Sequence, residues 1–182
     1  ELGWVHLTVD KQHIIIITEQ GQALRFNSSL VRSMGRPAAG VKAITLRKGD
    51  CISGMVVVTE DGELLVVTAN GYGKRTAMAA YNPKGRATMG VATFSRKAVA
   101  KATGPIVDVR SVQPDDQITI ISANGQALRT TVSDIRLLGR ATQGTRLIDL
   151  KPGDTVASVA RLAAADLPGL DMNETTIGPI AE

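Results

Sequence analysis

A composite motif recurs three times in this chain and constrains its fold more than any other feature. Each copy contains a Gly-x-x-x-Arg element, and a Gly-Arg-x-x-x-Gly element begins 14 residues after the first glycine. The first glycines are Gly21, Gly71 and Gly125, so the copies are 50 and 54 residues apart. A period of this size is typical of an array of supersecondary units, most often propeller-like blades.

Short β-branched runs precede each first glycine and indicate buried strands. The runs at 14–17, 64–67 and 118–121 are apolar at successive positions, so both faces of each strand are expected to be buried. Asn70-Gly71 and Asn124-Gly125 are strong tight-turn signals, because both residue types tolerate positive φ. The sequence therefore predicts one β-hairpin per unit, with the arginine on its second strand.

Each hairpin is followed by a polar stretch in which short helical turns are expected, and then by further strands. One set of strands is predicted at 41–46, 91–94 and 147–150. A second set, which leaves each unit toward the next hairpin, is predicted at 4–9, 51–58 and 106–112.

The connections between these strands differ among the copies. Copies one and three contain a Gly-Asp turn, whereas copy two has a longer basic connection over 95–104. From about residue 163 the β signal disappears and the chain is acidic. We expect β-sheet units over 1–162 and a loosely ordered acidic tail over 163–182.

Composition limits the partners and the compartment. The formal charge is +4, and aromatic residues make up only 3% of the chain, so stacking of bases on rings is not expected to dominate binding. Cys51 is the single cysteine, which excludes an internal disulfide and suits a reducing cytoplasm. No apolar run approaches 18 residues, so no membrane partner is predicted.

Residues that carry catalysis or bind metals form no recognisable constellation in the sequence. His6, His13 and Cys51 lack the spacing of a metal site, and the serines, aspartates and histidines are too scattered for a catalytic triad. Gly71-Tyr72-Gly73 lacks the rest of a dinucleotide fingerprint. We predict no catalytic residue, no metal and no cofactor.

The repeated cations point instead to a polyanion. A single copy fits a hairpin glycine beside a solvated arginine, but solvation alone does not require arginine at three equivalent places. The glycines would allow a loop to lie close to a DNA backbone, where arginine reaches phosphate.

The motifs resemble the C-terminal domain of the DNA gyrase A protein over nearly the whole chain, to about Leu162. The resemblance is carried by the string from Asn70 to Thr76, by Gly85-Arg86-Ala87-Thr88-Met89-Gly90, and by Gly139-Arg140-Ala141-Thr142-Gln143-Gly144. The C-terminal domain of topoisomerase IV is similar, and the sequence does not separate the two. The box close to Gln-Arg-Arg-Gly-Gly-Arg-Gly that the gyrase family carries on its first blade is absent here.

This resemblance implies an all-β fold, the β-pinwheel, in which four-stranded blades exchange a strand between neighbours. About three blades and part of another are expected. It also implies that the basic outer edge bends and wraps double-stranded DNA for ATP-dependent strand passage and negative supercoiling. The implied partners are the N-terminal cleavage domain of the same gyrase A protein, which holds the catalytic tyrosine, and the gyrase B protein. The implied DNA-binding residues are Arg25, Arg36, Lys74, Arg75, Lys84, Arg86, Arg129 and Arg140.

Two other classes of protein are built on blades and would show different sequence features. A propeller-type protein-interaction scaffold, similar to the chromosome-condensation regulator repeats, would show an exposed apolar or aromatic patch. An enzyme built on blades would need convergent carboxylates or histidines, and the sequence offers none.

Overall fold

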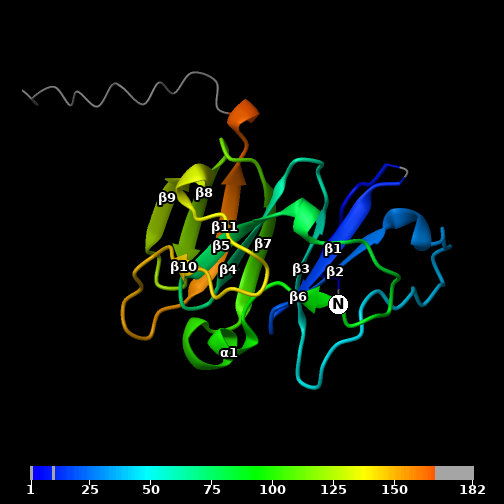
Figure 1. Cartoon of the computed structure of the whole chain (residues 1–182), viewed down its shortest axis with the longest axis horizontal. Helices are drawn as coiled ribbons and strands as arrows, with labels where there is room; N and C mark the ends of the chain where they lie inside the picture. Colours follow the sequence, from blue (N-terminus) through cyan, green and yellow to red (C-terminus); the bar gives the residue numbers. More distant parts are fainter. Residues whose placement is uncertain (1, 10, 167–182) are drawn as a thin grey trace, which may run out of the picture.

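The computed structural model describes residues 2–9 and 11–166, which form two four-stranded antiparallel sheets and one three-stranded sheet arranged side by side (Figure 1). The first sheet has the order β3-β1-β2-β6, from strands His13–Thr18 (β1), Gln22–Asn27 (β2), Ile52–Val57 (β3) and Val91–Ala92 (β6). The second has the order β10-β5-β4-β7, from Glu63–Thr68 (β4), Tyr72–Ala77 (β5), Ile106–Val112 (β7) and Thr145–Arg146 (β10). The third has the order β11-β8-β9, from Gln117–Ser122 (β8), Ala127–Thr131 (β9) and Val156–Leu162 (β11).

The three predicted hairpins are confirmed, and each is closed by a glycine with positive φ. Gly21, Gly71 and Gly125 have φ values of 86°, 77° and 83°. Single-turn helices follow each hairpin, as expected from the polar stretches; they are Ser28–Leu30 (η1), Met78–Ala80 (η2) and Val132–Asp134 (η4).

Strand exchange between units is also confirmed. β6 belongs to the second copy of the motif but pairs with β2 of the first, through Gln22↔Ala92 and Ala23↔Val91. β10 belongs to the third copy and pairs with β5 of the second, through Thr145↔Gly73 and Arg146↔Tyr72. Each unit is therefore tied to the previous one by backbone hydrogen bonds.

The core lies between the sheets, which explains the apolar runs on both strand faces. Along β4, Leu64 and Val66 pack into a cluster shared with the first sheet, and Leu65 and Val67 pack into a cluster shared with the third. All four side chains are buried. Because successive side chains of a strand point to opposite faces, only a sheet covered on both sides explains this run.

Several predicted strands are shorter than expected or are missing. Residues 4–9 and 41–46 form no strand, and the strands predicted at 91–94 and 147–150 are reduced to β6 and β10. A strand exists only where a neighbour completes its hydrogen-bond ladder. Within the described residues, backbone hydrogen bonds join segment 41–46 to the second unit only at Ala43 and Thr45, and 4–9 is largely exposed.

The chain after β11 ends its described part in a short helical turn, Ala164–Asp166 (η5). The rest of the predicted acidic tail lies outside the described residues. Among the helices of residues 2–9 and 11–166, none is both long and apolar enough to cross a membrane.

Candidate nucleic-acid interface

The arginine of each Gly-x-x-x-Arg element is paired in the same way in all three units. Its partner is the first residue of the preceding strand: His13 Nδ1 lies 3.1 Å from Arg25, Glu63 accepts from Arg75 at 2.8 Å, and Gln117 accepts from Arg129 at 2.7 Å. The partner differs in charge from unit to unit, but its position does not. The repeat therefore preserves a cross-strand pair at the open end of each hairpin.

Arg25 and Arg75 also hold the next unit in place. Arg25 donates to the carbonyl of Met78 at 2.9 Å, and Arg75 donates to the carbonyls of Ser133 and Ile135. These carbonyls lie at the single-turn helix of the following unit. Both guanidinium groups are half-buried, and burial lowers the pKa of Arg25 from its ordinary value.

Lys74 lies still deeper, although the family resemblance implies an exposed position for it at the basic edge. It is completely buried, and its ammonium donates to the carbonyls of Gly139 and Arg140 and to Thr142 Oγ1. The Nζ atom also lies 5.4 Å from the ring centroid of Phe94. The expectation of one exposed row is thus corrected for Lys74, and for the half-buried Arg25 and Arg75, because each points into the joint between units.

Lys74 makes the stability of the fold pH-dependent, since burial lowers its pKa to about 8. Between pH 8 and the unfolded value of about 10.4, the unfolded chain holds a proton that the native chain has lost. The free energy of unfolding should therefore rise across this window, by roughly 2–3 kcal/mol, relative to a variant without the lysine.

The control for this effect is Lys74→Leu, because Leu24 and Leu128 occupy the equivalent positions. Urea unfolding at pH 7.5 and 10 should show a stability difference between wild type and variant that changes with pH. A pH-independent difference would mean that Lys74 titrates normally in the native protein.

The Gly-Arg-x-x-x-Gly loops are the segments that reach from one unit to the previous one. A Cβ atom on Gly90 would lie 2.2 Å from the carbonyl oxygen of Ala23, and one on Gly144 would lie 2.6 Å from that of Gly73. The close approach that these glycines permit is thus to the protein's own backbone, at the start of the exchanged strand. Gly40, at the equivalent place in the first copy, has no neighbour within 4 Å among the described atoms.

The cations of these loops remain at the surface to different degrees. Arg36 and Lys84 are exposed, whereas Arg86 and Arg140 are less so. Arg86 donates to the carbonyls of Leu30 and Lys42, which attaches its loop to the first unit. With exposed Arg129, three of the eight predicted residues are therefore exposed, and Arg86 and Arg140 are half-buried, as Arg25 and Arg75 are.

Two further kinds of residue organise this surface, and only the first, the aspartates of the Gly-Asp turns, was not predicted from the sequence. Asp50 and Asp154, in the Gly-Asp turns, accept from the hairpin-turn N–H groups of Gln20 and Asn124 at 3.0 and 3.1 Å. Arg146 packs on Tyr72, 5.4 Å from the ring centroid, and pairs with Asp149 at 3.0 Å. The repeated Gly-Asp spacing was the signal for the aspartates, and Arg146 is predicted from its place just beyond the third Gly-Arg-x-x-x-Gly element to extend the row of cations.

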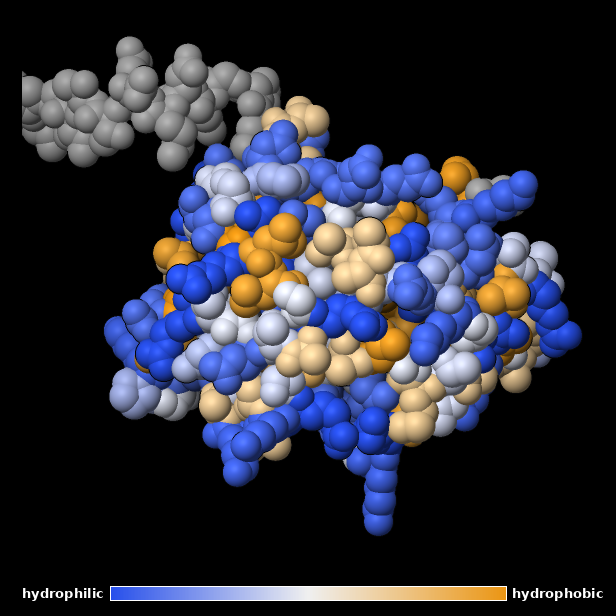
Figure 2. Space-filling model, in the orientation of Figure 1, coloured by the Kyte–Doolittle hydropathy of each residue, from blue (hydrophilic) through white to orange (hydrophobic). Residues whose placement is uncertain are grey.

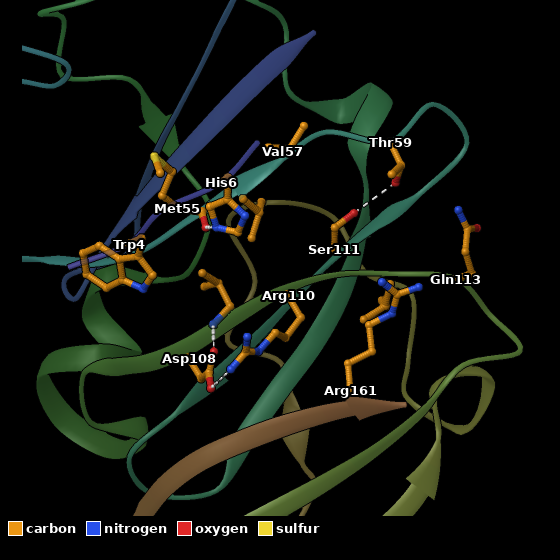
Figure 3. Close-up of a pocket in the computed structure, with 13 residues that line it drawn as sticks. Trp4, His6, Met55, Val57, Thr59, Asp108, Arg110, Ser111, Gln113 and Arg161 are labelled. Carbon is orange, nitrogen blue, oxygen red and sulfur yellow. Dashed lines mark hydrogen bonds and ion pairs between the residues drawn. The ribbon is translucent and has the colours of Figure 1, made fainter. Parts of the chain in front are cut away.

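A pocket lies between β3 and β7, which are edge strands of the first and second sheets (Figure 3). Its polar groups are paired with one another: Thr59 lies 3.0 Å from Ser111, Arg110 donates to Asp108, and His6 contacts the carbonyl of Met55. Two of these contacts join separate segments of the chain, the Asp108–Arg110 pair lies within β7, and none places a nucleophile beside a base. Within the described part of the chain, no group of three or more His, Cys, Asp or Glu residues is placed to hold a metal ion.

The family model for the DNA gyrase C-terminal domain, a beta-propeller, matches residues 12–59, 62–100 and 116–163. The DNA gyrase A protein of Chlamydia trachomatis is 37% identical over 159 residues, which are 87% of this chain and 19% of that protein. The DNA gyrase A protein of Escherichia coli K12 is 39% identical over 163 residues, which are 90% of this chain and 18% of that protein. The chain thus spans about a fifth of the length of these relatives.

Solved structures show the same fold. The C-terminal domain of DNA topoisomerase IV superposes with a TM-score of 0.82 at 28% identity, over 88% of this chain and 50% of that one. The DNA gyrase A C-terminal domain superposes with a TM-score of 0.79 at 30% identity, over 85% of this chain and 52% of that one.

Proposed function

Because this chain belongs to the DNA gyrase C-terminal domain family, we propose that it binds duplex DNA through the phosphate backbone and bends it. The observation that carries the proposal is that the loops that pass between units repeatedly carry cations that are exposed, Arg36 and Lys84, or half-buried, Arg86 and Arg140. In this proposal Arg36, Lys84, Arg86, Arg129 and Arg140 contact phosphate.

The three remaining predicted residues act on DNA indirectly. Lys74 fixes the loop that carries Arg140, and Arg75 fixes the turn that precedes it. Arg25 does the same for the turn before Lys84 and Arg86. These residues set the angle between successive units, and that angle determines the curvature that the duplex must follow.

The energy for bending has to come from the phosphate contacts. Bending a site of about 20–30 base pairs by 40–90° costs on the order of 1–6 kcal/mol. Each neutralised phosphate releases counterions, and arginine can grip a phosphate with two hydrogen bonds. Helices in the described residues are short turns, so none fills a major groove, and sequence preference should be weak.

In the intact protein, the bent DNA would be presented to the strand-passage machinery of a type IIA topoisomerase. The N-terminal cleavage domain of the gyrase A protein and the separate gyrase B protein are the proposed partners. The domain itself would supply binding and geometry and leave DNA cleavage and ATP hydrolysis to those parts. A bacterial cytoplasm, close to the nucleoid, is the compartment that this role requires.

Fluorescence anisotropy with two unrelated duplexes tests the proposal. Affinity should be nearly equal for the two sequences and should fall steeply between about 50 and 200 mM salt, with a log–log slope near −0.9 per phosphate contact. A triple variant of Arg36, Arg86 and Arg140 to alanine should lower that slope by roughly 2–3. The matched control is Arg110→Ala, an exposed cation in the pocket between β3 and β7.

Two results would contradict the proposal: affinity that does not depend on salt, or an equal loss in the triple variant and the Arg110 control. Circular dichroism of each variant separates loss of binding from loss of fold.

Protein–protein contact is a second candidate function, and one observation favours it. The segment 2–9 exposes Leu2, Val5, Leu7 and Val9, whose relative exposures are 80%, 72%, 97% and 69%. An exposed apolar strip of this kind fits a protein surface better than DNA. A chain that self-associates or captures protein, yet gives no anisotropy change with duplex at low salt, would favour this function.

A further inference from the structure

The connection between β6 and β7 differs in structure from the equivalent connections of the other units. It consists of a helical turn, Arg96–Ala98 (α1), and a π-type turn, Val99–Thr103 (η3). In units one and three the same place is taken by the short turns that contain Asp50 and Asp154. The family match includes residues 62–100 and resumes at 116, so it ends within this connection.

Several hydrogen bonds hold this connection in a fixed position. Its first residue, Ser95, donates from its backbone N–H to the carbonyl of Thr142 at 3.0 Å. At its far end, Thr103 and Ala102 accept from the backbone and side chain of Asn70 at 3.0 and 2.7 Å. Ala98, within the connection, is buried. The connection is therefore attached both to the loop of the third unit and to the hairpin turn of the second.

The outer side of this connection is strongly basic. Arg96, Lys97 and Lys101 are exposed, and the stretch 95–104 contains no acidic residue. None of the ion pairs formed within the described residues involves these three side chains. Three cations within six positions, held on a rigid support, give a concentrated positive charge.

The equivalent turns of the other units show a weaker form of the same pattern. Lys48 and Lys151 are exposed, while Asp50 and Asp154 are buried against backbone N–H groups. Each of these two turns therefore directs its carboxylate inward and a lysine outward. α1 lies at the lower edge of the molecule in Figure 1, and long hydrophilic side chains project from this edge in Figure 2.

We propose that Arg96, Lys97 and Lys101 form a second phosphate-binding site, which engages the duplex where it runs beyond the Gly-Arg-x-x-x-Gly loops. The inference rests on the proposed function for the class of its ligand. Its position rests on the Ser95–Thr142 hydrogen bond, which joins the connection to the loop that carries Arg140. A duplex lying on that loop meets the connection next, and its dense phosphate charge matches three clustered cations better than a scattered acidic protein surface does.

The test compares duplexes of two lengths in the 182-residue chain. The triple variant of Arg96, Lys97 and Lys101 to glutamine retains polar side chains of similar reach and removes their charge. Its affinity for a duplex of about 40 base pairs should fall on the order of 10-fold, and its salt slope should become shallower by roughly 2–3. A duplex of about 12 base pairs, too short to leave the loops, should bind within about twofold of wild type.

Controls separate this inference from the proposed function. The Arg36, Arg86 and Arg140 alanine variant should weaken binding of both lengths, and Arg110→Gln should change neither. If wild type binds no duplex, the proposed function fails. If wild type binds both duplexes and the glutamine variant matches it at both lengths, the second site is overturned while the proposed function stands. Polyglutamate is the probe for an acidic protein partner. If the glutamine variant loses binding to polyglutamate but binds both duplexes as wild type does, the site is overturned in favour of an acidic protein partner.

Discussion

Replacing Arg75 with alanine is expected to destabilise the fold by about 3–5 kcal/mol, because it leaves a buried carboxylate without its partner. Glu63 and Arg75 form an ion pair at 2.8 Å, with side-chain exposures of 11% and 12%. The same guanidinium satisfies the carbonyls of Ser133 and Ile135 in the next unit. The loss would therefore affect both the second sheet and its joint with the third, and would lower the melting temperature by roughly 10 °C.

The chain contains a matched control for this prediction. Arg129 occupies the equivalent place in the third unit but is exposed, and its described hydrogen bond goes to the neutral Gln117. Arg129→Ala should cost less than about 1 kcal/mol. The double variant Glu63→Leu with Arg75→Met should recover much of the lost stability, because no charge is then buried alone.

Thermal and urea unfolding would measure these differences. Equal destabilisation by Arg75→Ala and Arg129→Ala would mean that the pair contributes no more than a surface contact. In that case Arg75 would return to the set of residues available for DNA.

Gly90→Ala is expected to have the second large effect, about 3 kcal/mol or more, from backbone strain and a clash combined. Gly90 has a φ of 69°, and a Cβ atom there would meet the carbonyl oxygen and carbon of Ala23 at 2.2 and 2.8 Å. Positive φ alone costs alanine on the order of 1–2 kcal/mol. The clash is with backbone, so β6 must move away from β2, at a further cost of roughly 1–3 kcal/mol.

Gly40→Ala isolates the conformational part of this cost. Gly40 has a φ of 85° and open space around it, so its substitution should cost only on the order of 1–2 kcal/mol. Amide hydrogen exchange should show faster exchange along β2 and β6 in Gly90→Ala and little change there in Gly40→Ala. If the two variants were equally stable and their β2 and β6 amides equally protected from exchange, close packing of the exchanged strand would not be the reason for glycine at position 90.

Most of the fold follows from local patterns that the sequence contains. The run 64–67 lies in a sheet covered on both faces, and the Asn-Gly turns close hairpins at both places where they occur. The run 118–121 was predicted wrongly to be buried on both faces: Ile118 and Ile120 are buried but Ile121 is exposed, because in the described residues no further sheet covers the outer face of β8. The period near 50 residues then gives the number of units. The strands at 4–9 and 41–46 were predicted wrongly because their composition suits a strand, but pairing depends on a neighbour that local patterns do not specify.

The candidate interface was less predictable from the sequence, because the side chain of an arginine repeated in register can lie in either of two environments. It can face solvent and bind phosphate, or it can face a joint and bind backbone carbonyls. The carbonyls that Arg25 and Arg75 reach lie more than 50 residues away, so no local pattern distinguishes the two. For Lys74 the sequence does contain a signal of burial, because the residues at the equivalent positions, Leu24 and Leu128, are apolar.

By itself, then, the sequence determined the repeat, the hairpins and the family, because each depends on residue types at fixed spacings, and the resemblance to that family implied the exchange of strands. The tertiary structure alone decided which cations remain in contact with solvent. Burial of a charge depends on the distance to groups of another unit, and the packing of sheets sets that distance. For this reason Lys74 is buried at a joint while Arg96, Lys97 and Lys101 stand on an exposed edge.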